Sequence, residues 1–301
     1  MKVARTAAEL EPRRRAVALG TFDGVHLGHR RVLEETIAAG ETATAVTFHP
    51  HPRTALGNQV ELIATLERRL ELIEAAGIEE TLVVHFDLEL ARLGPETFAE
   101  RLLRPIGTET VITGPGFRFG RGRSGDLEVL RRLGFEARAV ELLEGVSSTR
   151  IRQLLREGEV AEAATLLGRP AEVDGTVVAG DARGGTLGFP TANVSVAPDL
   201  LVPAFGIYAG AAEGHRAATS IGTNPHYGGE ERRIEAFLLD FEGDLYGRRL
   251  VVELWSRLRE ERIFESEAEL VEQIARDVAE TRAAARPICG EAKEQQSRGN
   301  F

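Results

Sequence analysis

Two histidines three residues apart follow a glycine-rich turn early in the chain, in the string Gly20-Thr-Phe-Asp-Gly-Val-His-Leu-Gly-His29. An apolar run (16–19) precedes the string and an amphipathic segment (30–39) follows it, which predicts a strand, a turn and a helix. A helix start offers unpaired N–H donors and the positive end of the helix dipole. Because His26 and His29 can face the same side of that start, the string predicts a phosphate-binding corner that needs no lysine.

A simpler interpretation of this string is a strand-to-helix turn that carries two surface histidines. The string lies at the first strand-to-helix junction, however, where open α/β sheets bind ligands. Gly20 and Gly24 also allow backbone geometry that side chains would block. These features favour binding of nucleotide phosphates.

A second candidate site lies in the string Arg183-Gly-Gly-Thr-Leu-Gly-Phe-Pro-Thr-Ala-Asn193. Its glycines suit a close approach of the backbone to phosphates. Thr191 and Asn193 are two residues apart, so in an extended segment their oxygens point to the same face. Such neutral oxygens are reasonable Mg²⁺ ligands when phosphates and waters complete the octahedron. A glycine-rich hairpin loop with Asn193 in a turn is the alternative, and the spacing alone favours it.

Glu235 is a candidate general base on a predicted strand of the second half of the chain. Alternation places Arg233, Glu235 and Phe237 on one face and apolar residues on the other, which predicts that one face is core. A carboxylate on such a strand can accept a hydroxyl proton. A solvated glutamate, or one paired with arginine, is the alternative that the pattern leaves open.

The composition limits which chemistry is possible. The chain has 301 residues and a net charge of −10, which argues against a general nucleic-acid binder. The lysines are Lys2 and Lys293, so a lysine-containing P-loop and a lysine Schiff base in the core are excluded. Cys289 is the sole cysteine, which excludes an internal disulfide and a cysteine-based zinc site. No apolar run is long enough to span a membrane and no apolar signal core begins the chain, so we expect a cytoplasmic protein.

The order of predicted elements indicates two domains of different class. Strands and helices alternate in the first half, which predicts an α/β domain with a parallel sheet covered on both faces. After Pro170, strand-like runs follow one another with turns between them, which predicts a small antiparallel β-barrel followed by a C-terminal helix. We place the domains at 1–168 and 169–286 and expect a frayed tail at 287–301.

The predicted elements can be given by range. The predicted strands are 16–19, 43–48, 81–85, 109–113, 137–140, 172–179, 206–212, 217–221, 233–241 and 250–258. The predicted helices are 30–39, 62–76, 95–103, 126–133, 150–157, 160–167 and 266–285. Ser147-Ser-Thr149 is predicted to cap the helix at 150–157, and Ser266 with Glu269 to form a capping box.

Taken together, these motifs resemble the bacterial bifunctional riboflavin kinase/FMN adenylyltransferase family, also called FAD synthetase. The resemblance covers about 17–282, and the motifs occur in family order. In the first half they are Gly20 to His29, Thr47-Phe-His-Pro50, Phe117-Arg-Phe-Gly120 with Arg123-Ser-Gly-Asp126, and Ser147-Ser-Thr-Arg-Ile-Arg152. In the second half they are Leu187-Gly-Phe-Pro-Thr-Ala-Asn193, Gly206-Ile-Tyr-Ala209, Ile221-Gly-Thr-Asn-Pro225, Ile234-Glu-Ala, and Asp240-Phe-Glu-Gly-Asp-Leu-Tyr-Gly247.

The resemblance implies two reactions that share ATP as a substrate. The C-terminal domain would transfer the γ-phosphate of ATP to the 5′-hydroxyl of riboflavin, with Glu235 as base and Thr191 and Asn193 at the Mg·ATP phosphates. The Rossmann-like N-terminal nucleotidyltransferase domain would join FMN to AMP and release pyrophosphate, with His26 and His29 holding the triphosphate. Riboflavin, FMN and ATP are then the expected partners, with no nucleic acid, membrane or obligate protein partner, and Mg²⁺ is the expected cofactor.

The resemblance also assigns roles to groups of residues. The nucleotide-binding residues would be Gly20, Phe22, Asp23, Gly24, His26, Gly28, His29, Ser148, Thr149, Arg152, Gly188, Pro190, Thr191 and Asn193. The flavin-binding residues would be Phe48, Pro50, Phe117, Arg118 and Phe119.

The chain departs from the family pattern at Gly116, where members usually carry Asn or Asp. A riboflavin kinase whose N-terminal domain is weak or regulatory is therefore one rival interpretation. A second is a nucleotidyltransferase for another phosphate acceptor, and a third is a flavin-binding protein without turnover. A fourth is a histidine metal site, formed by His26, His29, His49 and His51.

Overall fold

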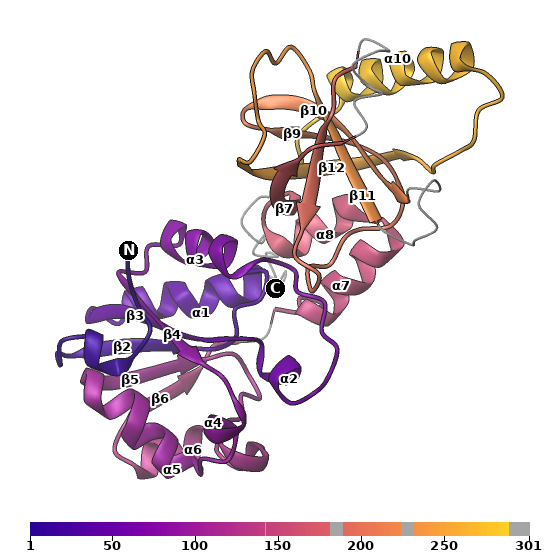
Figure 1. Cartoon of the computed structure of the whole chain (residues 1–301). Coiled ribbons are helices and arrows are strands. Elements are labelled where there is room, and N and C mark those ends of the chain that lie inside the picture. Colours follow the sequence, from indigo (N-terminus) through magenta and orange to yellow (C-terminus); the bar gives the residue numbers. More distant parts are fainter. Residues whose placement is uncertain (142, 181–188, 224–231, 289–301) are drawn as a thin grey trace, which may run out of the picture. The chain divides into compact units, whose positions relative to one another are not determined.

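The computed structural model describes residues 1–141, 143–180, 189–223 and 232–288, and the chain divides into two units (Figure 1). The first unit is Met1–Ser148 and the second begins at Thr149. Each unit contains its own sheet.

A six-stranded parallel sheet in the order β1-β4-β3-β2-β5-β6 forms the centre of the first unit. Its strands are β1 (Lys2–Ala4), β2 (Arg15–Leu19), β3 (Thr42–His49), β4 (Glu80–His85), β5 (Thr108–Thr113) and β6 (Glu136–Ala139). The chain runs from β2 outward through β3 and β4, and later places β5 and β6 on the other side of β2. The strand order therefore reverses between β2 and β5, and ligands bind open α/β sheets outside the carboxyl ends of strands at such a point.

Helices cover both faces of this sheet, as the sequence predicts. They are α1 (Leu27–Ala38), α2 (Pro52–Ala55), α3 (Leu66–Ala75), α4 (Leu88–Ala91), α5 (Pro95–Phe98) and α6 (Leu127–Arg132), with short helical turns η1 (Ala7–Glu9), η2 (Ala99–Leu103), η3 (Arg104–Ile106) and η4 (Arg121–Arg123). Alternate residues of β2 pack into hydrophobic clusters on opposite faces of the sheet. Val17 belongs to a cluster with Phe98 of α5, whereas Ala18 belongs to one with Leu33 of α1 and Ile73 of α3. The α/β class is therefore confirmed.

Three local features of this unit differ from the predicted ranges. The helix that contains the predicted segment 30–39 begins at Leu27, which agrees with the expected place of His26 and His29 at its start, and His26 caps it. The helix predicted at 62–76 begins at Leu66, because the Thr65 hydroxyl accepts a hydrogen bond of 3.1 Å from Arg68 N. Strand β1 was not predicted, since three residues are too few for a periodic pattern, and it is fixed by pairing with β4.

The second unit contains a closed barrel in the order β10-β11-β8-β7-β12-β9, with antiparallel neighbours throughout. Its strands are β7 (Ala171–Val178), β8 (Ala192–Val196), β9 (Gly206–Ala212), β10 (His215–Thr223), β11 (Arg232–Leu238) and β12 (Arg249–Arg259). The predicted barrel is confirmed, but β8, which joins β7 to β11 and so closes it, was not predicted. Ile234, Ala236 and Leu238 are buried, so the predicted core face of β11 is also confirmed.

Among the described residues, three helices of this part of the chain lie outside the barrel: α7 (Ser148–Glu157), α8 (Val160–Leu167) and α10 (Glu267–Ala283). Ala204 N donates a 3.0 Å bond to Leu155 O of α7, and a Cβ at Gly158 would lie 3.0 Å from Arg257 Cδ of β12. The turn between α7 and α8 therefore packs on the barrel strands. This is why the second unit begins at Thr149, before the predicted domain boundary at 168/169.

The C-terminal helix begins where the sequence predicts. Ser266 Oγ accepts a 3.2 Å bond from Glu269 N, but the Glu269 carboxylate accepts from Glu265 N instead of Ser266 N. The predicted reciprocal capping box is therefore only half formed. Of the predicted frayed tail at 287–301, residues 289–301 lie outside the described ranges.

The buried ion pair of Arg15 and Glu80 suggests a stability test for the first unit. Glu80 Oε2 accepts bonds of 3.0 and 2.6 Å from Arg15 Nε and Nη2, and the Arg15 side chain has no solvent exposure. Glu80→Ala leaves a buried cation uncompensated, which should cost ~3–5 kcal/mol and lower the first unit's melting temperature by roughly 10 °C. Scanning calorimetry measures this shift.

The matched control is Glu109→Ala, which breaks the solvent-exposed pair with Arg14. It should move the transition by about 1 kcal/mol or less. Equal shifts for Glu80→Ala and Glu109→Ala would contradict the importance of the buried pair.

Candidate active sites

His26 and His29 form the first candidate site, at the junction of β2 and α1. His26 is the N-cap of α1, and its Nδ1 accepts a 3.3 Å hydrogen bond from His29 N. The two rings stack with centroids 3.7 Å apart and an interplanar angle of 15°. The predicted placement of both imidazoles on one side of a helix start is therefore confirmed. Since Nδ1 of His26 is an acceptor, the neutral ring carries its proton on Nε2, where it is a hydrogen-bond donor.

The other predicted residues of this string shape the loop. Gly24 has φ +77°, and a Cβ there would lie 2.7 Å from Ile63 Cγ2. A Cβ at Gly20 would lie 3.1 Å from the Phe22 ring, and one at Gly28 3.2 Å from His26 Cε1. These contacts leave little room for side chains.

Phe22 and Asp23 are buried beneath the loop. Phe22 is 1% exposed, and its ring meets the His29 ring edge-on at 5.4 Å. The Asp23 carboxylate, also 1% exposed, accepts bonds from Ile63 N at 3.0 Å and Ala64 N at 3.3 Å. The structure thus places both residues where they hold the loop and its histidines in position.

The predicted flavin-binding residues divide into buried and accessible groups. Phe48 and Phe119 are each 6% exposed, and their rings lie 6.3 and 5.2 Å from Phe98 in the core. The Phe117 ring stacks on Phe119 at 5.9 Å and is only partly buried. Arg118 is exposed and pairs with Asp126 at 2.9 Å. Phe117 and Arg118 are therefore the more accessible members of this set, together with the partly buried Pro50.

Helix α7 begins at Ser148, two residues before the predicted start at 150, so Ser148 and Thr149 lie inside its first turn and do not precede it as caps; Arg152 follows in the same helix. Ser148 Oγ lies 3.5 Å from Asp23 O, within the first unit. Thr149 and Arg152 belong to the second unit. Their role in phosphate binding stays a prediction.

The second candidate site lies where β8 and β11 pair. Asn193 and Glu235 are register partners, and Arg233 Nε lies 3.0 Å from Asn193 Oδ1 and 2.6 Å from Glu235 Oε1. A Cβ at Gly180 would lie 2.1 Å from Asn193 Nδ2, so glycine leaves room for the amide. The structure therefore brings the predicted base next to one predicted Mg²⁺ ligand, through an arginine that was not predicted as a site residue.

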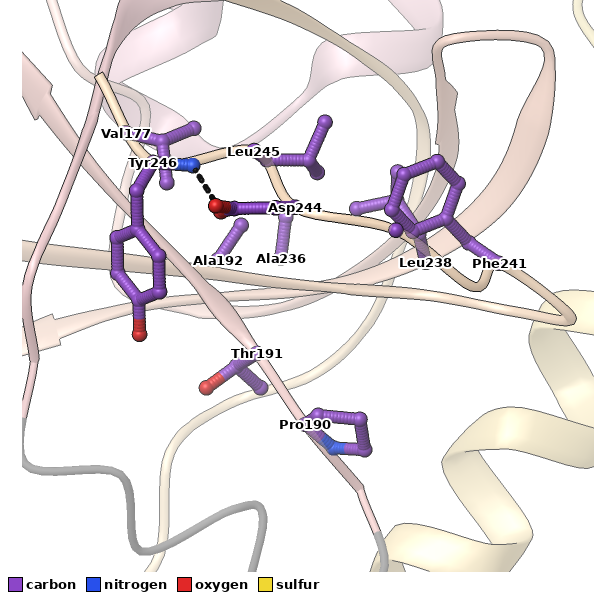
Figure 2. A pocket seen from close by; sticks show the side chains of 11 residues that line it. Val177, Pro190, Thr191, Ala192, Ala236, Leu238, Phe241, Asp244, Leu245 and Tyr246 are labelled. Atoms are coloured by element: carbon purple, nitrogen blue, oxygen red, sulfur yellow. Dashed lines mark hydrogen bonds between the residues drawn. The ribbon is translucent and has the colours of Figure 1, made fainter. Parts of the chain in front are cut away.

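Thr191 and Pro190 line a pocket of about 160 Å³, together with Ala192 and Ala236, the chain neighbours of Asn193 and Glu235 (Figure 2). Its other lining residues are Val177, Leu238, Phe241, Gly243, Asp244, Leu245 and Tyr246. Asp244 Oδ1 accepts a 2.9 Å bond from Tyr246 N, which shapes the loop between β11 and β12. The sequence reveals a turn at Glu242-Gly-Asp244, but only barrel closure brings that turn beside Thr191. Gly188, predicted for the same site, lies outside the described residues.

Glu261 is a further carboxylate that the sequence reasoning missed. Burial raises the pKa of Glu261, and the Glu235 carboxylate raises it further, against the opposite effect of Arg259. A Cβ at Gly222 would lie 1.8 Å from Glu261 Oε1. Glycine at this position therefore accommodates a second carboxylate near the predicted base.

The interpretation as a histidine metal site gains no support from this geometry. Within the described ranges, no group of three or more His, Cys, Asp or Glu side chains is placed to hold a metal ion. His51 Nδ1 instead accepts a 3.2 Å bond from Arg53 N at the start of α2.

Comparison with known proteins identifies the family of this chain. Residues 8–152 match the FAD synthetase family model, and residues 167–285 match the riboflavin kinase family model. The bifunctional riboflavin kinase/FMN adenylyltransferase of Listeria monocytogenes is 35% identical over 288 residues, covering 89% of this chain and 92% of that protein. The Bacillus subtilis protein of the same name is 36% identical, covering 90% and 92%. The chain belongs to the bifunctional riboflavin kinase/FMN adenylyltransferase family.

A solved structure also matches the fold of this family member. It is titled a macrolide-efflux protein from Streptococcus pneumoniae, and it aligns with a TM-score of 0.85 and 30% identity over 94% of this chain and 99% of that one. No helix in the described part of this chain is long and apolar enough to cross a membrane.

Gly116 departs from the usual family residue at a position that accepts it conformationally. Its φ is +67°, in the left-handed region where Asn and Asp are the best tolerated non-glycine residues, and a Cβ there meets nothing within 4 Å. It follows β5 in the loop that carries Phe117 and Arg118. A short polar side chain at this position is therefore compatible with the backbone.

We expect Gly116→Asn to fold normally and to raise adenylyl transfer or tighten FMN binding, because it adds a polar group beside the predicted flavin residues. Gly116→Val is the matched control, since a β-branched residue is strained at positive φ and should cost roughly 1–2 kcal/mol. Steady-state kinetics with FMN, and thermal melts, measure both effects. Loss of activity in a folded Gly116→Asn protein would show that the site is built around glycine.

Proposed function

We propose that this protein phosphorylates riboflavin to FMN with ATP in its second unit and adenylylates FMN to FAD, releasing pyrophosphate, in its first. The observation that carries this proposal is that one chain matches both family models and that each matched segment contains an organised set of reactive residues. These sets are the stacked His26 and His29 pair at a helix start and the Asn193, Arg233 and Glu235 cluster.

In the kinase reaction, Glu235 accepts the proton of the riboflavin 5′-hydroxyl as the oxygen attacks the γ-phosphorus of ATP, and the bond to the bridging oxygen breaks so that ADP leaves. Arg233 holds the Glu235 carboxylate in place and also contacts the Asn193 amide oxygen. The apolar walls of the neighbouring pocket, such as Val177, Leu238 and Phe241, suit the base of ATP.

The donor set of this site fits Mg²⁺ that arrives with ATP. The Thr191 hydroxyl and the Asn193 amide are neutral hard oxygens, and an amide oxygen keeps a second lone pair beyond the one that Arg233 occupies. Bound Mg²⁺ supplies neutralisation of phosphate charge. Thr191, which lines the pocket, and Asn193, two residues further along the chain, would hold it.

In the adenylyl transfer, a phosphate oxygen of FMN attacks the α-phosphorus of ATP and pyrophosphate leaves. His26 Nε2, His29 and the first N–H groups of α1 bind the triphosphate and stabilise its developing charge. Ser148, whose hydroxyl lies 3.5 Å from Asp23 O in the same unit, binds a further phosphate oxygen. Phe117, Arg118 and Pro50 contact the flavin nucleotide, and the buried Phe48 and Phe119 support them.

The remaining expectations rest on the sequence alone. They are a cytoplasmic location and the absence of a nucleic-acid, membrane or obligate protein partner.

The decisive experiment is incubation of the pure protein with riboflavin, ATP and Mg²⁺, with flavins separated by chromatography over time. We expect FMN first and FAD later, because FMN is the product of one reaction and the substrate of the other. If FMN accumulates without FAD, the kinase activity is supported and the first unit has weak or regulatory function. If no FMN forms, the proposed kinase activity is contradicted.

Two variants should separate the reactions. His29→Ala removes a phosphate contact and should slow FAD formation from supplied FMN by ~10²–10³-fold, while FMN formation continues. Glu235→Gln keeps the size of the side chain but cannot accept the proton, so kcat for FMN formation should fall by ~10²-fold with little change in KM. Initial rates for each reaction measure both. Loss of both activities in either variant would contradict the assignment of one reaction to each unit.

A further inference from the structure

A fully buried arginine joins the two strand ends that carry the candidate nucleotide and flavin residues. Arg69 lies on α3 and has no solvent exposure. Its Nη1 donates bonds of 3.0 Å to Thr21 O and 3.1 Å to Phe48 O. Thr21 lies in the loop after β2, and Phe48 lies near the carboxyl end of β3.

A threonine hydroxyl completes the same junction. Thr47 Oγ1 donates a 3.0 Å bond to Thr21 O and lies 3.4 Å from Arg69 Nη1. Thr47 is fully buried. The β2 loop and the end of β3 are thus connected both directly and through Arg69.

The start of α3 anchors the β2 loop a second time. The Asp23 carboxylate accepts the backbone N–H groups of Ile63 and Ala64, immediately before the Thr65 cap of α3. Thr21 is therefore held by α3, and Asp23 by the segment that leads into α3. This fixes the loop that leads into His26 on two sides.

Packing alone does not explain this side chain, because a buried guanidinium is costly to desolvate and an apolar residue of similar volume would fill the space. What Arg69 adds is a fixed separation between two backbone segments. Adenylyl transfer needs such a constraint, since its two substrates must meet in line and a displacement of about 1 Å can cost ~10²-fold in rate.

We propose that Arg69 is a positioning residue for adenylyl transfer, which sets the spacing between the loop that binds ATP and the strand end that borders FMN. This proposal rests on the proposed adenylyltransferase function of the first unit. Each substrate keeps its own contacts without Arg69, so its loss changes the alignment of the substrates more than their binding.

The test is steady-state FAD formation from supplied FMN and Mg·ATP by the full-length protein. For Arg69→Met we expect kcat to fall ~10²-fold, with KM for ATP and FMN changed by no more than about threefold, as uniform binding is retained. Arg69→Lys should recover part of the loss, because the bonds to Thr21 O and Phe48 O both come from Nη1, so an ammonium in that place can donate to both carbonyls. A purely structural role would not produce a selective fall in kcat with rescue by lysine.

A second pair of variants decides the question if Arg69→Met does not fold. Thr47→Val removes the bridging hydroxyl at constant shape and should lower kcat ~10-fold. Thr44→Val is the matched control on the same strand, since Thr44 is also fully buried and its hydroxyl contacts only Thr42 O at 3.4 Å within the described part of the chain. FMN formation from riboflavin and the first unit's melting temperature are recorded for every variant.

The outcomes are distinct. If Arg69→Met folds, an unchanged kcat would overturn the proposal, whether or not KM is raised. If Arg69→Met does not fold, equal kcat values for Thr47→Val and Thr44→Val would overturn it. A wild-type protein that makes no FAD would instead contradict the proposed function of the first unit.

Discussion

The hydrogen bond from His29 N to His26 Nδ1 determines where α1 begins, and the first candidate site depends on that position. Because His26 is the cap, both imidazoles lie at the first turn, beside the N–H groups that the helix leaves unpaired. If the helix began at Arg30, both histidines would lie in the preceding loop, and the helix start would not hold their rings stacked at 3.7 Å. This one hydrogen bond therefore places both imidazoles at the positive end of the helix dipole.

Patterns of apolar residues predicted most of the architecture, and the failures have identifiable physical causes. Val17, Ala18 and Leu19 serve two cores, and such an apolar run predicts a buried parallel strand. The cap at His26 was missed because capping preferences favour Ser, Thr, Asp and Asn. Strand β8 was missed because its regularity comes from pairing with β7 and β11, which no local pattern encodes.

The candidate sites were predicted in part, for similar reasons. Motif residues such as Thr191 and Glu235 can be identified from type and spacing, but their partners come from other elements. Arg233 acts on Asn193 across a strand pair, and Tyr246 reaches the pocket only because the barrel closes. Arg69 carries no signal in the sequence, since its position on α3 looks like that of any charged helical residue.

Because lysine is scarce in this chain, arginine side chains make the hydrogen bonds that join backbone segments in both units. Arg69 connects Thr21 to Phe48 in the first, and Arg216 donates to Thr281 O and Ala284 O at the end of α10 in the second. In both cases a single nitrogen, Nη1, donates to two carbonyl oxygens, so one side chain joins two parts of the chain. Arg233 likewise places one nitrogen, Nε, near both an amide oxygen and a carboxylate.

The chemistry of the two reactions explains why one site has a carboxylate available as a base and the other, within the described residues, does not. Riboflavin presents an alcohol that must lose a proton, so a base such as Glu235 belongs beside the reacting oxygen, and Arg233 at 2.6 Å offsets its charge. FMN presents a phosphate whose second pKa is about 6, so its attacking oxygen is already ionised at neutral pH and needs no base. A carboxylate facing the triphosphate would only repel it. The acidic residue of that loop, Asp23, is instead 1% exposed and accepts hydrogen bonds from the N–H groups of Ile63 and Ala64, where its charge holds the loop in place.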